Sequence, residues 1–247
     1  MRHDDNLINA PPHINYMELK NKIVLLTGAS TGIGKSIAES FLDKGTKVIV
    51  FGLHKPKFCS EFYKVDVSKE DKIVSALSKI KKIDVLINNA GVAKIATIKE
   101  TSNEIFEEMF NINFKGSFWM SKHSIPKLNE NGCIINISSL AGLKSFEGYG
   151  IYCATKSAVI SLTKTLALEL ANRKIRANCI APGIINTEIW SKMYGAEGKK
   201  KLKENEKYIL LKRSGKPEEI AKTAIFLCEN DFVNGETILV DGGENIQ

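Results

Sequence analysis

Short apolar runs without polar alternation recur along the chain, and helix-like segments separate most of them. The clearest runs span residues 23–26, 47–51, 85–87, 133–137 and 177–180. Runs of this kind are typical of strands that are buried on both faces of a parallel sheet. Because parallel strands are joined by right-handed crossovers, the alternation predicts an α/β fold, an open doubly wound parallel sheet with helices on both faces.

Further segments complete the pattern. We expect strands over 62–65, ending at Asp66, and around 237–240; helices over 33–42, 73–80, 103–122 and 152–172; and a helical pair between Glu188 and Cys228. The connection over 52–61 is an exception, because ten residues that include Pro56 are too short for a crossover helix. A loop is therefore expected there.

The chain is predicted to form one domain with an N-terminal extension. Its 247 residues suit a single α/β domain, and no repeat or linker follows residue 20. We expect a loosely ordered extension over 1–20 and a folded domain over 21–247. The extension lacks the apolar segment of a signal peptide, and no stretch reaches the ~18 apolar residues of a membrane span. A cytoplasmic protein without membrane contact is the expectation.

Charge and cysteine content narrow the function classes. The net charge is +7, but the lysines are mixed with acids, and even the dense run over 199–203 is followed by Glu204 and Glu206. A nucleic-acid site would need a basic stripe interleaved with aromatic residues, so no nucleic-acid partner is expected. The five cysteines include no CxxC pair, which predicts neither a metal site nor a disulfide framework.

A glycine-rich turn, TGASTGIG over residues 27–34, follows the first predicted strand. Gly28 permits a tight turn, Gly32 allows the backbone to approach a pyrophosphate, and Gly34 lets the next helix pack close to the strand. The N–H groups at the positive end of that helix would hold phosphates. The turn predicts a dinucleotide phosphate site, with an ordinary turn as the alternative.

Two other predicted strand ends point to the same edge of the sheet. Asn88-Asn89-Ala90-Gly91 has small residues that leave room for a ribose, and Asp66 could accept a hydrogen bond from an adenine amino group. Asn, Asp and Gly are also good turn residues, so a purely structural role stays open for both.

Tyr152 and Lys156 are four residues apart on a predicted helix, which places both on one face. A phenol with a pKa near ~10 is a poor proton shuttle at neutral pH. We expect the Lys156 ammonium to lower the pKa of Tyr152 and so fit it for general acid/base catalysis. Lys156 could also hydrogen-bond ribose hydroxyls.

The YxxxK spacing alone is not specific, since Tyr16/Lys20 and Tyr208/Lys212 share it. Only Tyr152 has a serine thirteen residues before it, Ser139, at the end of a predicted strand. That strand end and the start of the next helix both face the ligand-binding edge of the sheet. We expect the other two pairs to be structural.

Together, TGxxxGIG, Asn88-Asn89-Ala90-Gly91, Asn113, Ser139, Tyr152-x-x-x-Lys156 and Pro182-Gly183 resemble the single-domain branch of the short-chain dehydrogenase/reductase family. The resemblance extends from about Leu19 to Gly243. It implies a Rossmann-type catalytic domain in which Ser139 orients the substrate oxygen and Tyr152 exchanges its proton. Asn113, at a helix irregularity, would hold a water of a proton relay from Lys156. The cofactor contacts that the motifs imply are Gly28, Ser30, Thr31, Gly32, Ile33, Gly34, Asp66, Val67, Asn88, Ala90, Gly91, Tyr152, Lys156, Pro182, Gly183, Ile184 and Thr187.

The choice between NAD and NADP stays open. An acid after the second strand would accept the ribose 2′-OH and select NAD, but Gly52 stands at that place. His54 and Lys55 could meet the 2′-phosphate of NADP. Against NADP, Thr31 is not the basic residue that NADP-preferring relatives often carry.

The substrate is expected to be a small alcohol or carbonyl compound. The segment over about 187–213 would form a lid with an apolar inner side, carrying Trp190 and Tyr194, although a simple surface helical pair is the alternative. The short 52–61 connection resembles that of some aldohexose dehydrogenases and favours a sugar or polyol. A 3-oxoacyl-carrier-protein reductase and a non-catalytic dinucleotide-binding sensor are the alternatives. The family resemblance also implies a homo-oligomer, with a tetramer favoured over a dimer.

Overall fold

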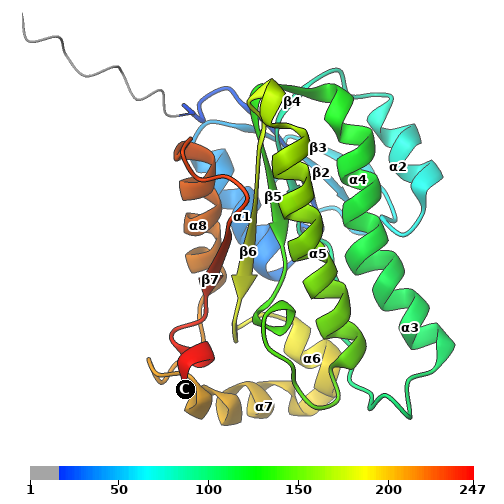
Figure 1. Cartoon of the computed structure of the whole chain (residues 1–247), viewed down its shortest axis with the longest axis vertical. Helices are drawn as coiled ribbons and strands as arrows, with labels where there is room; N and C mark the ends of the chain where they lie inside the picture. Colours follow the sequence, from blue (N-terminus) through cyan, green and yellow to red (C-terminus); the bar gives the residue numbers. More distant parts are fainter. Residues whose placement is uncertain (1–16) are drawn as a thin grey trace, which may run out of the picture.

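A computed structural model describes residues 17–247. Seven strands form one parallel sheet in the order β3-β2-β1-β4-β5-β6-β7 (Figure 1). The chain returns to the middle of the sheet between β3 and β4, so the carboxyl ends of β1 and β4 flank the point where strand order reverses. This is the edge at which such sheets bind ligands. The strands are β1 (Ile23–Thr27), β2 (Lys47–Gly52), β3 (Glu61–Lys64), β4 (Ile83–Asn88), β5 (Leu128–Ile137), β6 (Arg176–Pro182) and β7 (Thr237–Val240).

Helices cover both faces of the sheet, as the apolar runs predict. Val24 and Leu26 of β1 belong to one core cluster, which includes α1 and α8 side chains, whereas Leu25 belongs to the other, with side chains of α2, α4 and α5. Alternate residues of one strand therefore enter opposite layers. The helices are α1 (Gly32–Asp43), α2 (Glu70–Leu77), α3 (Asn103–Met109), α4 (Gly116–Ser124), α5 (Gly150–Glu169), α6 (Ile189–Tyr194), α7 (Gly198–Asn205) and α8 (Pro217–Glu229).

The structure differs from the predicted elements at two places. The expected helical pair between Glu188 and Cys228 is wrong, since three α-helices, α6, α7 and α8, occupy this stretch. Gly195, with a φ of 58°, ends α6, and Pro217 begins α8. The expected helix over 103–122 is interrupted by a π-helix, Phe110–Lys115. The loop expected between β2 and β3 is confirmed.

The N-terminal boundary of the folded domain lies close to Leu19. Residues 1–16 lie outside the described part, whereas Leu19 is buried in the cluster beneath α1 and α8. Within the described residues, no helix is both long and apolar enough to cross a membrane. Helices α6 and α7 lie across the carboxyl edge of the sheet (Figure 1), where the predicted lid was placed.

Candidate active site

The first two turns of α5 bring Tyr152 and Lys156 to the end of β5. The Lys156 ammonium is buried, donates a hydrogen bond to the Ile137 carbonyl at 2.9 Å, and lies 5.7 Å from the centre of the Tyr152 ring. Ser139 follows β5 directly and caps a short 3-10 helix, its hydroxyl accepting a hydrogen bond from the Ala141 N–H at 3.1 Å. The Ser139 hydroxyl also hydrogen-bonds the Tyr152 phenol and lowers its pKa. The three side chains that the sequence singled out therefore converge.

The pKa of Tyr152 corrects one expectation. Lys156 was expected to lower it, but burial of the phenol raises it above its ordinary value, and the Ser139 hydrogen bond offsets this only in part. The physical reason lies in where Lys156 points. Its ammonium is directed to the Ile137 carbonyl rather than to the phenol oxygen, so its charge does not offset the burial of Tyr152.

Burial also disfavours the charged form of Lys156 and lowers its pKa to about 8. Gly91 lies beside the ammonium, and a Cβ at this position would be 3.4 Å from Nζ. Since glycine has no side chain, this space stays open. The Ser138 hydroxyl donates to the Lys156 carbonyl at 2.8 Å and ties the helix to the end of β5. The lysine is thus held on both its main chain and its side chain.

Asn113 lies in the π-helix between α3 and α4, so the expected helix irregularity is present. Its buried amide accepts from the Val92 N–H at 2.8 Å and donates to the Val92 carbonyl at 2.9 Å and to the Thr155 hydroxyl at 3.1 Å. Both amide hydrogens are used, so the side chain fastens the segment after β4 to α5. Thr155 had no sequence signal of its own, because a threonine inside a helix is common.

The glycine-rich turn adopts the conformation that its sequence predicts. Gly28 has a φ of 71°, and a Cβ there would lie 2.9 Å from Ala90 Cα. At Gly34 a Cβ would lie 2.2 Å from the Gly28 carbonyl oxygen, so only glycine lets α1 start this close to β1. The Asn89 amide donates to the carbonyls of Thr27 and Gly28 at 3.0 and 2.8 Å and holds the turn in place.

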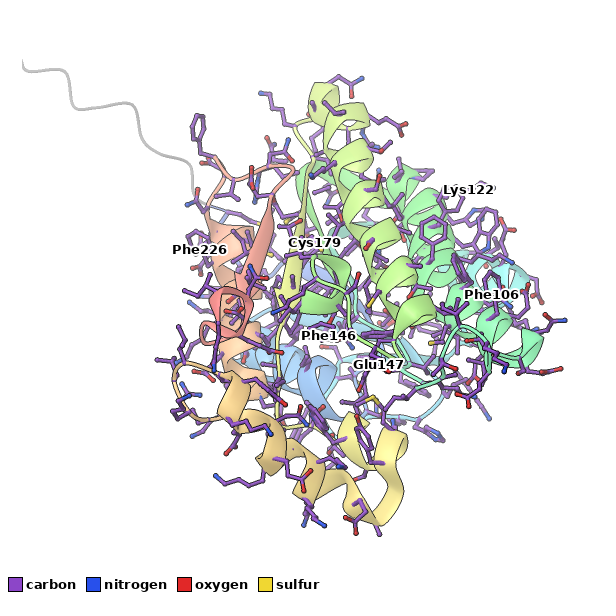
Figure 2. The ribbon with its side chains drawn as sticks, turned by 60° about the horizontal axis from the view of Figure 1, so that its bottom comes forward. Phe106, Lys122, Phe146, Glu147, Cys179 and Phe226 are labelled. Atoms are coloured by element: carbon purple, nitrogen blue, oxygen red, sulfur yellow. The ribbon has the colours of Figure 1, made fainter. Side chains whose placement is uncertain are left out.

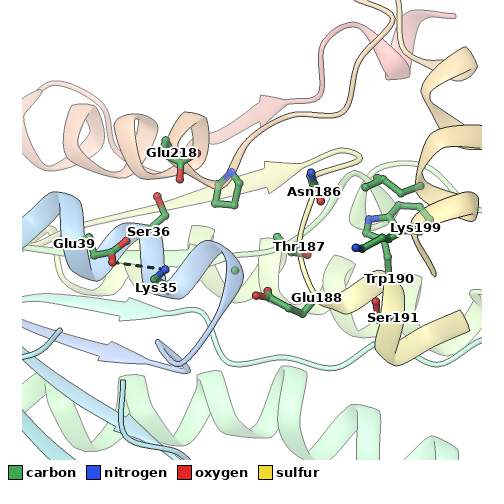
Figure 3. Close-up of a pocket in the computed structure, with 13 residues that line it drawn as sticks. Lys35, Ser36, Glu39, Asn186, Thr187, Glu188, Trp190, Ser191, Lys199 and Glu218 are labelled. Carbon is green, nitrogen blue, oxygen red and sulfur yellow. Dashed lines mark ion pairs between the residues drawn. The ribbon is translucent and has the colours of Figure 1, made fainter. Parts of the chain in front are cut away.

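The turn leaves backbone donors available for an anion. Thr31 precedes α1 without making a side-chain capping bond, so its hydroxyl does not use the first N–H groups of the helix. Thr187 lies opposite, since a Cβ on Gly32 would come within 3.2 Å of it. A cavity of about 290 Å³ lies beside this contact, between α1, the 186–191 segment and the start of α8 (Figure 3). Ser139, Tyr152 and Lys156 do not line it, so it adjoins the glycine-rich turn and not the catalytic end.

The Pro182-Gly183-Ile184 segment ends β6 and continues beyond it on the same edge. The Gly183 N–H donates to the Val240 carbonyl at 3.0 Å, and the Ile184 N–H donates to the Glu244 carboxylate at 3.1 Å. Glu244 is buried, which raises the pKa of its carboxyl group. No local pattern along the chain singles out Glu244, because it lies 60 residues from its partner.

The remaining predicted cofactor contacts lie at the ends of β3 and β4. The Asn88 side chain is buried and donates to Asn136 Oδ1 at 2.8 Å and Ser121 Oγ at 3.1 Å, so it is not directed toward the sheet edge. Asp66 Oδ1 accepts from the Ser68 N–H at 2.9 Å, the turn contact that was its structural alternative. Val67 is buried against Gly116.

The other YxxxK pairs are separate from this site where they can be placed. Tyr208 is half exposed in a 3-10 turn after α7, and the Lys212 ammonium donates to the Lys207 carbonyl. Tyr16 lies outside the described residues.

The five cysteines are all free thiols, and four of them are buried.

An aromatic group adjoins the site and joins α6 to α5. The Tyr149 and Tyr194 hydroxyls are 2.9 Å apart, and the Tyr149 ring meets the Tyr152 ring edge to face with centres 6.2 Å apart. Tyr194 stacks on Trp190, whose indole N–H donates to the Ile185 carbonyl at 3.0 Å. Trp190 and Tyr194 belong to the predicted lid, but the sequence did not indicate their link to Tyr149.

Comparison with known proteins yields consistent matches. Residues 28–245 match the family model described as enoyl-(acyl carrier protein) reductase. The chain is 36% identical to 3-oxoacyl-acyl-carrier-protein reductase FabG of Thermotoga maritima, over 92% of this chain and 99% of that protein. It is 32% identical to an NAD-dependent glycerol dehydrogenase of Listeria innocua, over 93% and 96%.

Solved structures agree with these sequence relatives. The aldohexose dehydrogenase of Thermoplasma acidophilum superimposes with a TM-score of 0.87 at 32% identity, over 94% of this chain and 97% of that one. ElxO with NADP bound superimposes with a TM-score of 0.82 at 31% identity, over 92% and 100%.

Proposed function

The chain belongs to the short-chain dehydrogenase/reductase family, and we propose that Tyr152, assisted by Ser139 and Lys156, is its catalytic centre. The protein is an NAD(P)-dependent oxidoreductase that acts on hydroxyl or carbonyl groups. The convergence of a phenol, a hydroxyl and a buried ammonium at the end of β5 is the observation that supports this centre.

A bound nicotinamide dinucleotide accepts or supplies the hydride. In the oxidative direction, the Ser139 hydroxyl holds the substrate oxygen, and the Tyr152 oxygen takes the proton of the substrate hydroxyl. In the reductive direction Tyr152 returns a proton to the new alkoxide. Since burial raises the pKa of Tyr152, this role requires the Lys156 ammonium to turn from the Ile137 carbonyl toward the ligand side of Tyr152.

The residues present fit the cofactor. The Gly28 and Gly34 positions have no room for a side chain, and the start of α1 has N–H groups that the Thr31 hydroxyl does not cap. In our proposal the turn holds the pyrophosphate, Asp66 and Val67 flank the adenine, and the backbone at Asn88, Ala90 and Gly91 follows the ribose. The Pro182–Ile184 segment and Thr187 receive the carboxamide.

Turnover of a Tyr152→Phe variant tests the proposal. The variant keeps the ring and loses the proton that the mechanism transfers, so we expect a fall of about 10² or more in kcat with nearly unchanged cofactor affinity. Absorbance of the reduced nicotinamide measures the rate, and titration of protein fluorescence measures the affinity. A Tyr208→Phe variant is the control, and undiminished kcat in Tyr152→Phe would refute the mechanism.

The substrate we propose is a sugar or another polyol. Two observations support it: the likeness to the aldohexose dehydrogenase and the glycerol dehydrogenase, and the phenolic hydroxyls of Tyr149 and Tyr194 beside the catalytic ring. A 3-oxoacyl group on a carrier protein is the second candidate, supported by the 36% identity to such a reductase. Three lysines of the α7 segment that could meet an acidic carrier are instead paired with Glu197, Glu204 and Glu206.

A parallel assay separates these substrates and the two cofactors. Aldoses, glycerol and secondary alcohols are oxidised with NAD and with NADP, and 3-oxoacyl thioesters are reduced with NADH and with NADPH. Turnover of free polyols supports the first candidate, whereas activity confined to carrier-bound thioesters and lost at high salt supports the second.

We also propose a cytoplasmic location, in keeping with five free thiols.

A further inference from the structure

Two phenols from distant parts of the chain meet beside the catalytic tyrosine. Tyr149 is the residue just before α5, and Tyr194 is the last residue of α6. Their hydroxyl oxygens are 2.9 Å apart, and both side chains remain partly exposed. Phe146 and Glu147, in the loop that leads to Tyr149, lie between α5 and the yellow α6 segment in Figure 2.

The two hydroxyls of this pair can form further hydrogen bonds. In a pair of neutral phenols one O–H donates to the other oxygen, which leaves the second O–H and the remaining lone pairs free. Burial and the contact with Tyr194 raise the pKa of Tyr149 well above its ordinary value, so the Tyr149 phenol keeps its proton near pH 7. The pair therefore presents one donor and additional acceptor positions to a neighbouring group.

The place of the pair relative to the catalytic ring limits what that group can be. The Tyr149 ring contacts the Tyr152 ring edge to face, with 6.2 Å between centres. We therefore expect a substrate whose reacting oxygen meets Ser139 and Tyr152 to bring its neighbouring atoms toward Tyr149. Phe146 packs on Tyr149 and Trp190 stacks on Tyr194, so the two hydroxyls are polar groups beside aromatic side chains.

We propose that the Tyr149–Tyr194 hydroxyl pair recognises a substrate hydroxyl group other than the one that reacts, and so favours polyhydroxylated substrates over monohydric ones. This inference rests on the proposed oxidoreductase centre at Tyr152. Once a bound substrate covers these hydroxyls from water, a substrate without the second hydroxyl leaves them unpaired, and the position discriminates against it. Neither residue touches the reacting atoms, so both determine specificity without taking part in the chemistry.

The pair also joins the α6 segment to α5, and this second role must be separated from recognition. Loss of a latch would weaken every substrate alike, because closure over the site would be impaired regardless of what is bound. Loss of recognition would weaken only substrates that carry the additional hydroxyl. Matched substrates with the same reacting carbon distinguish the two roles.

Glycerol and 2-propanol make such a pair, since both present a secondary hydroxyl on a three-carbon skeleton and only glycerol has neighbouring hydroxyls. D-glucose and 2-deoxy-D-glucose make a second pair. The variants are Tyr149→Phe, Tyr194→Phe and the double variant, with Tyr208→Phe, a half-exposed phenol after α7, as the matched control. Steady-state kinetics gives kcat and KM for each substrate, and thermal unfolding reports whether each variant is intact.

We expect each single Phe variant to raise KM for the more hydroxylated substrate of a pair by about 5- to 10-fold, with kcat changed less than about 3-fold. The value of kcat/KM for the less hydroxylated substrate should stay within about 2-fold of wild type, as should all values for Tyr208→Phe. Equal losses on both members of a pair would overturn recognition in favour of a latch, and unchanged KM values would overturn both. Absence of any alcohol turnover by the wild-type protein would instead refute the proposed polyol substrate, and the inference with it.

Discussion

Burial and charge oppose each other at Lys156. The ammonium is 5% exposed, and its pKa is lowered to about 8 because burial penalises the charged form. For a base with a folded-state pKa below its unfolded value, the charged form costs stability below pH 8, and this cost disappears as the pH rises toward 10.5. A protein selected for stability alone would place no lysine here, which is consistent with a catalytic role.

A Lys156→Met variant should therefore separate stability from activity. The lowered pKa means that burying the ammonium costs about 3 kcal/mol of folding free energy, which the variant recovers. The variant also loses the hydrogen bond to the Ile137 carbonyl, which stabilises the fold by about 2 kcal/mol. The variant should therefore be more stable by about 1 kcal/mol at pH 7. We expect kcat to fall by about 10² or more while the unfolding temperature stays equal or rises. Lys164→Met, on the exposed side of the same helix, is the control. A clear drop in the unfolding temperature of Lys156→Met alone would contradict this account.

Among the elements, the start of α8 shows how charge stabilises a helix end. Glu219 receives two hydrogen bonds from Arg213, at 2.9 and 2.7 Å, and one from the Lys216 N–H at 2.7 Å, so its carboxylate caps the first turn of the helix. These contacts lower its pKa to about 2, with the Arg213 hydrogen bonds as the largest cause. The helix begins shortly after the 187–213 segment that we expect to form a lid, so its N-terminus helps to set where that segment ends.

We expect a Glu219→Gln variant to be less stable at pH 7 by about 0.5 to 1 kcal/mol, a modest value because the side chain is 36% exposed. The folded-state pKa lies below the unfolded value of about 4.5, so the contribution is complete above pH 4.5 and is lost as the pH falls toward 2. Urea unfolding at pH 7 and pH 3 measures the difference, which should shrink at the lower pH. Glu218→Gln removes a charge from the same turn as the control, and a pH-independent difference would count against the carboxylate.

At the scale of the whole molecule, large apolar side chains remain exposed on helices and at the C-terminal side. Leu168 of α5 is 80% exposed and Phe232, after α8, is 97% exposed. Exposed apolar side chains are candidates for contacts between subunits. We propose a homo-oligomer, with a tetramer favoured, that packs through the long helices and the C-terminal strand.

Light scattering at micromolar concentration should therefore give a mass at least twice the 27.4 kDa of one chain. Leu168→Glu should lower the mass, because a carboxylate would be buried without a partner in the interface. Val74→Glu, at an exposed position of the shorter helix α2, should leave it unchanged. A wild-type monomer would exclude the proposed assembly, and equal masses for wild type and Leu168→Glu would exclude α5 as its interface.

Features that depend on a local pattern could be predicted from the amino-acid sequence. Apolar runs placed the strands, and the glycine spacing over 28–34 predicted a turn that the structure confirms. Helical periodicity put Tyr152 and Lys156 on one face, and the order of elements brought Ser139 to them. These features follow from residues within one element or at the end of a strand, where backbone geometry leaves few choices.

The tertiary structure alone decided features that depend on contacts between distant segments. It buries the Tyr152 phenol, which raises the pKa that was expected to fall, and it directs the Lys156 ammonium to the Ile137 carbonyl. It also brings Tyr194 to Tyr149 across 45 residues, and Glu244 to the Ile184 N–H across 60. Side-chain direction and burial are set by how helices and loops pack over the sheet edge, and no periodic pattern along the chain encodes that packing.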